Sequence, residues 1–249
     1  MLLCNTDEEI EKESDYIDKL ISTGVDGVLI TPTGVMSRKN LKKLQKYNIP
    51  YTLIDRKIDQ AECDLVLGDN HAGTKNIIQH FIDNGHKRIG MIHAPLDIST
   101  AEERYEAYMD TLRANQLPFD EKLVIQSHYK KDKGSDLIAP FYELPKNERP
   151  TAIFAANNFI AIDSIRALNE RGIRVPEDMA IACFDDLDPY LSLEPFLTVS
   201  SQPAYDFGYT GVQFLIERVE GNAPPSYRKI VLQSELLIRK SSLNTQFRY

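Results

Sequence analysis

The stretch TAIFAANNFIAIDSIRALNERGIRVPEDMAIACFDD, residues 151–186, decides the fold class. It begins with a short apolar run at 151–155 and ends with another at 180–184. Between these runs, apolar residues recur at three- and four-residue intervals over 158–171, which is typical of a helix with one buried face. Asn157 is expected to cap the start of this helix. A strand, a helix and a second strand in this order predict a βαβ unit with parallel strands.

The same alternation extends over the whole chain. Further strand-like runs lie at 2–4, 27–31, 51–54, 64–68, 88–93, 122–125, 197–201 and 230–233, and further helical patterns lie at 7–23 and 100–115. Continuous apolar runs of this kind suit strands that helices cover on both faces. About ten strands are too many for one comfortable twisted sheet, so we expect two sheets in two lobes.

Composition limits the classes of function. The chain has 249 residues, of which 42% are apolar and 27% charged, as in ordinary soluble globular proteins. No apolar run is long enough to span a bilayer, and the first residues do not resemble a signal peptide. A cytoplasmic location is expected because the three cysteines form no disulfide framework, which fits a reducing compartment. The net charge is −8 and the basic residues are scattered, so this chain alone is not expected to bind DNA well.

No pattern for catalysis, a metal or a cofactor is visible. Cys4, Cys63 and Cys183 lie far apart with no CxxC spacing, which argues against a disulfide scaffold and against a zinc site. The histidines show no HxxxH or HExxH spacing. There is no GxSxG elbow, no Walker lysine loop and no GxGxxG. We therefore predict a protein that is not an enzyme and has no cofactor.

Several stretches, in the same order along the chain, resemble the LacI/GalR family of bacterial repressors. They are LGDNHAGTKNIIQHFIDNGHKRIGMIHAPLDISTAEERYEAY, PTAIFAANNFIAIDSIRALNERGIRVPEDMAIACFDDLDPYLSLEPFLTVSSQPAYDFG and ELLIRKSS, with LLCNTDEE and PYTLIDR nearer the start. The resemblance covers essentially the whole chain. It implies the effector-binding domain of a transcription regulator.

The resemblance also implies a periplasmic-binding-protein-like fold, with two doubly wound parallel-sheet lobes and a ligand cleft between them. The first lobe would hold 1–69 plus 203–232, the second would hold 70–202 plus 233–243, and 244–249 would be a tail. Ligand binding would close the lobes and reposition a DNA-binding headpiece. The expected partners are a small effector, operator DNA only through that headpiece, and a second copy in a homodimer.

The chain departs from the family pattern at its start. Family members carry a helix-turn-helix headpiece and a first βα unit before the segment that matches LLCNTDEE, and this sequence begins with that segment. Because the first strand of a doubly wound sheet is central, we expect an apolar slot in the first lobe.

Three residues of the second lobe are the main candidates for ligand contact. Arg104 lies near the start of a helix, at a position where the resemblance implies ligand contact. Its guanidinium can donate a bidentate pair to vicinal hydroxyls or to a carboxylate, and a solvated first-turn arginine is the alternative. Asp185 follows the run 180–184, where a carboxylate can accept two hydroxyl hydrogen bonds or serve as a loop acid. Asn157 suits a hydroxyl as well as a helix cap.

Other candidates rest on weaker arguments. Tyr129 matches a position where relatives place an aromatic ring against the ligand, and an exposed loop tyrosine is the alternative. Gln202 and Asp55 follow strand-like runs, and Asp55 could equally serve as a cap or in a hinge. Asp186 is an acid beside the site whose role the sequence leaves open, and Asn158 stands where the family often has Asp. Two more residues, Asp69 and Asn70, lie at the first predicted crossover, where hinge geometry explains them as well as ligand contact does.

The resemblance implies that sugars and sugar phosphates are the commonest effectors, with nucleobases as a minority. A sugar phosphate would need more positive charge than Arg104 alone provides, so we expect a neutral sugar. A periplasmic sugar-binding protein of a transporter is the alternative function, because it shares the fold. The segments FDDLDPYLSLEPFLTVSSQPAYDFG and ELLIRKSS favour the repressor.

Overall fold

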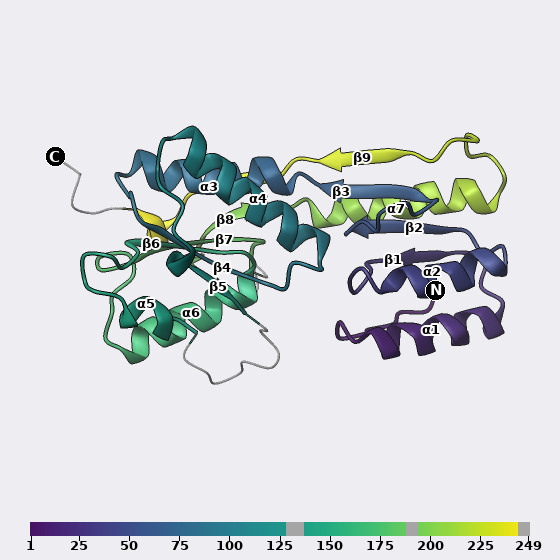
Figure 1. Cartoon of the computed structure of the whole chain (residues 1–249). Coiled ribbons are helices and arrows are strands. Elements are labelled where there is room, and N and C mark those ends of the chain that lie inside the picture. The colour runs from purple at the N-terminus through teal and green to yellow at the C-terminus, as the bar shows by residue number, and fades with distance from the viewer. Residues whose placement is uncertain (128–136, 188–193, 244–249) are drawn as a thin grey trace. The chain divides into compact units, whose positions relative to one another are not determined.

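The computed structural model describes residues 1–127, 137–187 and 194–243 (Figure 1). The chain divides into two compact units, each built from separate segments. Unit 1 comprises Met1–Asp69, Asp97–Thr100 and Pro203–Leu232, and unit 2 comprises Asn70–Leu96, Ala101–Gln202 and Gln233–Tyr249. Among the described residues, no helix combines the length and the apolar character needed to cross a membrane.

Unit 1 contains a parallel sheet with the strand order β1-β2-β3-β9. Its strands are β1 (Val28–Ile30), β2 (Tyr51–Asp55), β3 (Asp64–Gly68) and β9 (Lys229–Leu232), and its helices are α1 (Ile10–Thr23), α2 (Ser37–Lys46) and α7 (Ala204–Val219). Side chains alternate between the two faces of a strand. Accordingly, Leu53 of β2 packs in the core with α1 and α2, and the next residue, Ile54, packs against Phe207 and Phe214 of α7.

The strand predicted at 2–4 is wrong. These residues have no strand conformation, and the side chains of Leu2 and Leu3 are exposed. A strand needs a neighbour to bond its backbone groups, and the described part of this sheet begins at β1. The helix predicted from residue 7 begins at Ile10, because Asp7 and Glu8 have left-handed φ angles of 52° and 61°. The apolar slot stays a prediction.

Unit 2 contains a sheet with the order β10-β8-β7-β6-β4-β5, in which only β10 is antiparallel. Its strands are β4 (Ile89–His93), β5 (Val124–Gln126), β6 (Ala152–Ala155), β7 (Ala180–Phe184), β8 (Thr198–Ser201) and β10 (Glu235–Leu237). Its helices are α3 (Asn70–Asp83), α4 (Ser99–Ala114, whose first two residues belong to unit 1), α5 (Ala139–Glu143) and α6 (Asn158–Glu170), with 3-10 turns η1 (Glu121–Leu123) and η3 (Lys240–Ser242).

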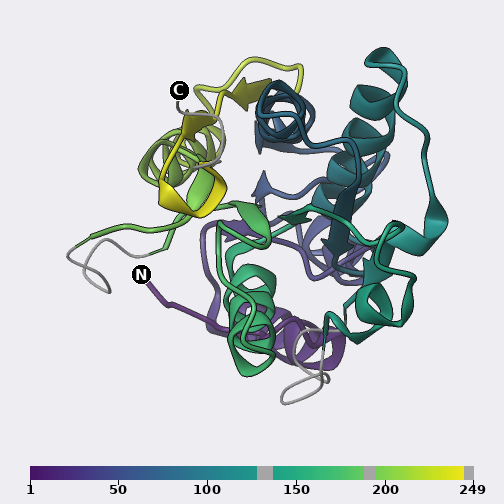
Figure 2. The same ribbon diagram turned by 90° about the vertical axis from the view of Figure 1, so that its left-hand side faces the viewer.

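Helices cover both faces of this sheet (Figure 2). Met91 of β4 packs with α3 and α4, whereas its neighbour Ile92 packs with α5 and α6. Both faces of the central strands are therefore buried, which explains their continuous apolar sequences. The α/β class and the two parallel sheets predicted from the sequence are confirmed.

Candidate functional site

Three of the predicted site residues follow neighbouring strands of unit 2. Asn157 comes soon after β6, Asp185 directly after β7 and Gln202 directly after β8. These strands are parallel and adjacent, so their carboxyl ends lie along one edge of the sheet. In open α/β sheets this edge is where ligands bind.

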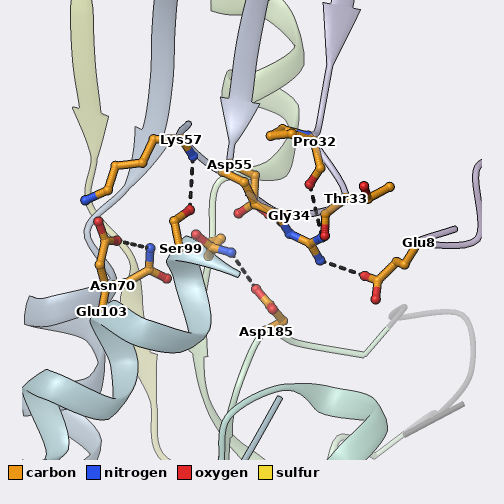
Figure 3. A network of polar contacts seen from close by, with 12 residues as sticks. Glu8, Pro32, Thr33, Gly34, Asp55, Lys57, Asn70, Ser99, Glu103 and Asp185 are labelled. Carbon is orange, nitrogen blue, oxygen red and sulfur yellow. Dashed lines mark hydrogen bonds and ion pairs between the residues drawn. The ribbon is translucent and has the colours of Figure 1, made fainter. Parts of the chain in front are cut away.

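Asp185 is held by contacts from two sides. Gln202 Nε2 donates to Asp185 Oδ1 at 2.6 Å (Figure 3). Asp185 Oδ2 lies 3.5 Å from Arg104 Nη1. The backbone of Asp185 has a φ of 67°, a left-handed conformation that Asp and Asn tolerate better than most residues. The structure therefore brings three predicted residues, Asp185, Gln202 and Arg104, into one connected group.

Arg104 is buried, with only 5% of the residue exposed. Its Nε donates to Asn70 Oδ1 at 2.8 Å, and its Nη1 donates to the Ala156 carbonyl at 2.6 Å. The guanidinium carbon lies 3.7 Å from the centre of the Phe184 ring, a cation–π contact. This burial excludes the alternative interpretation of Arg104 as a solvated first-turn residue.

The cap predicted for Asn157 is confirmed. Its Oδ1 accepts a hydrogen bond from Ile160 N at 2.8 Å at the start of α6. The amide of the following residue, Asn158, donates to the Asp186 carbonyl at 2.9 Å. A ligand contact by Asn157 stays a prediction, in addition to the cap that it forms.

Asp186 makes a structural ion pair. Arg239, which lies between β10 and η3, donates to both of its carboxylate oxygens at 2.7 and 2.6 Å. These hydrogen bonds lower the pKa of Asp186, although partial burial opposes the shift. Asp186 therefore joins the loop after β7 to the segment after β10.

Two candidates remain, one in unit 1 and one outside the described residues. Asp55 lies in unit 1 as the last residue of β2, with a φ of 63°, and its Oδ2 is 3.8 Å from Arg56 Nε. Arg56 in turn donates to Glu8 Oε1 at 2.7 Å and to the Pro32 carbonyl at 3.2 Å (Figure 3). Tyr129 lies outside the described residues. Ligand contacts by Asp55 and Tyr129 stay predictions.

Two neighbours of Arg104 were not assigned to the site from the sequence. The sequence assigns Asn70 equally to hinge geometry or to ligand contact. In the structure Asn70 is the first residue of α3, and its Oδ1 accepts a hydrogen bond from Arg104 Nε at 2.8 Å. The same signal that identified Asp185, a polar residue close after a strand, could have found it. Phe184 ends an apolar run, and no pattern in the sequence distinguishes it from a core residue.

The connected group offers hydrogen-bonding groups of both kinds. The guanidinium of Arg104 donates and the carboxylate of Asp185 accepts, so their charges offset each other. Within the described ranges, no three His, Cys, Asp or Glu side chains are close enough to hold a metal ion. The arrangement is suited to binding a small neutral molecule that has hydroxyl groups.

Comparison with known sequences agrees with this fold. Residues 78–242 match the family described as periplasmic binding protein-like domain. The chain is 31% identical over 245 residues to the HTH-type transcriptional repressor PurR of Actinobacillus pleuropneumoniae serotype 3, covering 98% of this chain and 72% of that protein. It is 30% identical over 244 residues to the ribose operon repressor of Halalkalibacterium halodurans, covering 97% and 70%.

Solved structures give the same result. A regulatory protein of the LacI family from Chloroflexus aggregans is 28% identical with a TM-score of 0.80, over 93% of this chain and 83% of that one. The transcriptional regulator CelR in complex with cellobiose is 26% identical with a TM-score of 0.81, over 94% and 71%.

Proposed function

The chain belongs to the LacI family of transcription regulators and contains their periplasmic binding protein-like domain, and from this premise we propose that it senses a small neutral sugar through Arg104, Asp185, Asn157 and Gln202. The observation that carries the proposal is the buried Arg104 beside Asp185 at the carboxyl edge of the unit 2 sheet. The cellobiose complex of CelR supports a sugar as the ligand class.

Charge favours a neutral sugar over a sugar phosphate. Arg104 already faces Asp185, and the neighbouring Arg239 is occupied by Asp186. A phosphate needs guanidinium or ammonium groups that are not already neutralised by carboxylates. A polyol instead uses the donor and the acceptor together.

We propose the remaining partners at the level of the family. The net charge of −8 suits a sensor, and operator contacts are assigned to a helix-turn-helix headpiece, the element that gives the HTH-type relatives their name. A homodimer, a cytoplasmic location and a role without catalysis complete the proposal. Sedimentation equilibrium tests the dimer.

A thermal-shift screen tests the ligand class. The probes are D-ribose, cellobiose, ribose 5-phosphate and hypoxanthine, each over a wide concentration range. A true ligand raises the melting temperature in proportion to the logarithm of its concentration above the dissociation constant. We expect a neutral sugar to do so. A shift with hypoxanthine alone or with ribose 5-phosphate alone would refute the neutral-sugar assignment.

Two substitutions test the site. Arg104→Lys keeps the charge but loses the fork of N–H donors, and Asp185→Asn removes the charge while still tolerating the left-handed backbone. Each should reduce the thermal shift strongly. The matched controls are Arg113→Lys and Asp110→Asn, an exposed pair on the same helix. Undiminished shifts in both site variants would contradict the assignment.

A further inference from the structure

The amide of Asn70 joins two charged residues of α4. Its Nδ2 donates to Glu103 Oε2 at 2.8 Å (Figure 3). Its Oδ1 accepts from Arg104 Nε at 2.8 Å. Only 2% of Asn70 is exposed. Asn70 is also the residue at which the chain enters unit 2 after Asp69 of unit 1. The arginine of the proposed site is therefore bonded to a crossover residue.

A neutral side-chain amide matches the two neighbours of this position. A guanidinium can only donate hydrogen bonds and an ionised carboxylate can only accept them. The group between Arg104 and Glu103 must therefore accept on one side and donate on the other, which the amide of Asn70 does in one orientation only. An aspartate here would place two carboxylates against each other, and a leucine would leave the buried Nε–H of Arg104 without its partner.

The other contacts of Arg104 do not fix its orientation by themselves. The ring of Phe184 lies 3.7 Å from the guanidinium carbon, a contact that does not set the direction of the nitrogens. The carbonyl of Ala156 and the carboxylate of Asp185 both contact the same nitrogen, Nη1. The bond from Nε to Asn70 holds a second nitrogen, and two anchored nitrogens fix the direction of the guanidinium.

We propose that Asn70 is a positioning residue that sets the direction of the Arg104 guanidinium, and that Glu103 in turn holds the amide of Asn70. A ligand that is bound through a planar fork of N–H donors depends on that direction. The effect on ligand affinity rests on the proposed function. The orientation of Arg104 does not, and it can be measured without a ligand.

The first experiment observes the Nε–H group of Arg104 by ¹⁵N–¹H NMR of the full chain after arginine-selective labelling, with Arg104→Lys to identify the signal. We expect a resolved signal that exchanges slowly with water, because the group is buried and bonded. Asn70→Asp should broaden the signal or speed its exchange. Asn70→Asp combined with Glu103→Gln should restore it, since the introduced amide donates to the introduced carboxylate.

Two further variants keep this experiment decisive. Asn115→Ala removes another partly buried amide of unit 2, one that bonds Gln79 and the Thr111 carbonyl, and it should leave the Arg104 signal unchanged. Glu103→Ala changes a half-buried residue and is a milder substitution if Asn70→Asp does not fold. It too should speed the exchange, because the amide of Asn70 loses its anchor.

The second experiment measures binding of D-ribose by calorimetry. Asn70→Asp should weaken it roughly 10- to 100-fold, as expected for a disturbed hydrogen bond to a charged group, and the double variant should recover most of the loss. An Arg104 signal that is unchanged by both Asn70→Asp and Glu103→Ala overturns the proposal, whether or not D-ribose binds. An Arg104 signal that changes in Asn70→Asp and is restored in the double variant supports the positioning role of Asn70. If the unsubstituted chain binds no sugar, the proposed function is refuted, but the result for the positioning role stands.

Discussion

Asp64, the first residue of β3, shows how one carboxylate can join three segments of unit 1. Arg218 Nε of α7 donates to its Oδ2 at 2.8 Å, and the backbone N of Arg228, just before β9, donates to its Oδ1 at 2.7 Å. Its side chain is fully buried. Burial alone raises the pKa of Asp64, but the hydrogen bonds from Arg218 and Arg228 outweigh it and lower the pKa to about 2.

Asp64→Asn should lower the free energy of unfolding near neutral pH by about 3 kcal/mol. This is the low end of the range for breaking a buried ion pair, and it applies here because the side chains of both arginines are partly exposed to water. An aspartate in the unfolded chain has a pKa of about 3.9. Since the folded pKa is lower, the stabilisation by Asp64 is complete above that value and is lost as pH falls toward about 2.

Urea unfolding across this pH range measures the effect. The difference in free energy of unfolding between the unsubstituted protein and Asp64→Asn should shrink as the pH falls. Asp110→Asn, at an exposed residue, is the control and should show a small difference throughout. A difference for Asp64→Asn that stays constant down to the lowest pH would contradict the prediction.

Among the elements, helix α3 makes a close approach to the sheet of unit 2 through Gly73. A Cβ atom at Gly73 would lie 2.5 Å from Ser234 Oγ, 2.6 Å from Ser200 Oγ and 2.7 Å from Phe184 Cε2. The two serines are already bonded to each other at 2.7 Å. Because α3 begins with Asn70 and Phe184 lies against Arg104, this packing also supports the proposed site.

Gly73→Ala should therefore destabilise the protein by roughly 1–3 kcal/mol through overpacking. The matched control is Gly208→Ala in α7, where a Cβ atom meets nothing within 4 Å. That change should stabilise the chain by about 0.5–1 kcal/mol, because alanine favours a helix. Thermal and urea unfolding compare the two variants. Effects of the same sign would show that the contacts of Gly73 do not decide the outcome.

The elements predicted correctly are those with a strong local pattern. The strands and the helix within 151–186 have continuous apolar runs and a capping Asn157, so the sequence alone locates them. Strand β10 was missed because it has three half-exposed or exposed residues and pairs only at the edge, with β8. The run at 2–4 is apolar, but its sequence cannot show whether a neighbouring strand is available.

In the candidate site, too, the sequence locates the residues that follow a strong local pattern, but not the contacts between distant residues. Placing Asp185 and Gln202 at one sheet edge follows from the rule for parallel strands, because each directly follows an apolar run. The bond between Arg104 and Asn70 joins residues 34 positions apart, and only the packing of α3 beside α4 produces it. The ligand contacts themselves stay predictions.

At the scale of the whole molecule, both units depend on the last segment of the described chain. Unit 1 receives β9, while β10 and η3 belong to unit 2. In η3, Ser241 Oγ accepts from Thr198 N at 2.8 Å and donates to the Ile181 carbonyl at 2.7 Å. The end of this segment therefore holds β7 and β8 in place.

Ending the chain after Leu232 should separate the contribution of β9 to unit 1 from that of β10 and η3 to unit 2. All four strands of unit 1 remain, but unit 2 loses β10, η3 and the ion pair between Arg239 and Asp186. We expect hydrogen exchange to speed up in β7 and β8 while β2 and β3 stay protected. Ending after residue 228 also removes β9 and should expose β3. Equal loss of protection in both units after the first truncation would contradict this assignment.

The distant origin of β9 has a consequence for synthesis of the protein. On the ribosome, β1, β2 and β3 emerge before unit 2, but the strand that pairs with the far edge of β3 is translated only after the parallel strands of unit 2. An unpaired apolar edge is a template for association with other chains. The far edge of β3 therefore stays without its native neighbour while unit 2 is being translated, and during that time it is exposed to pairing with other chains.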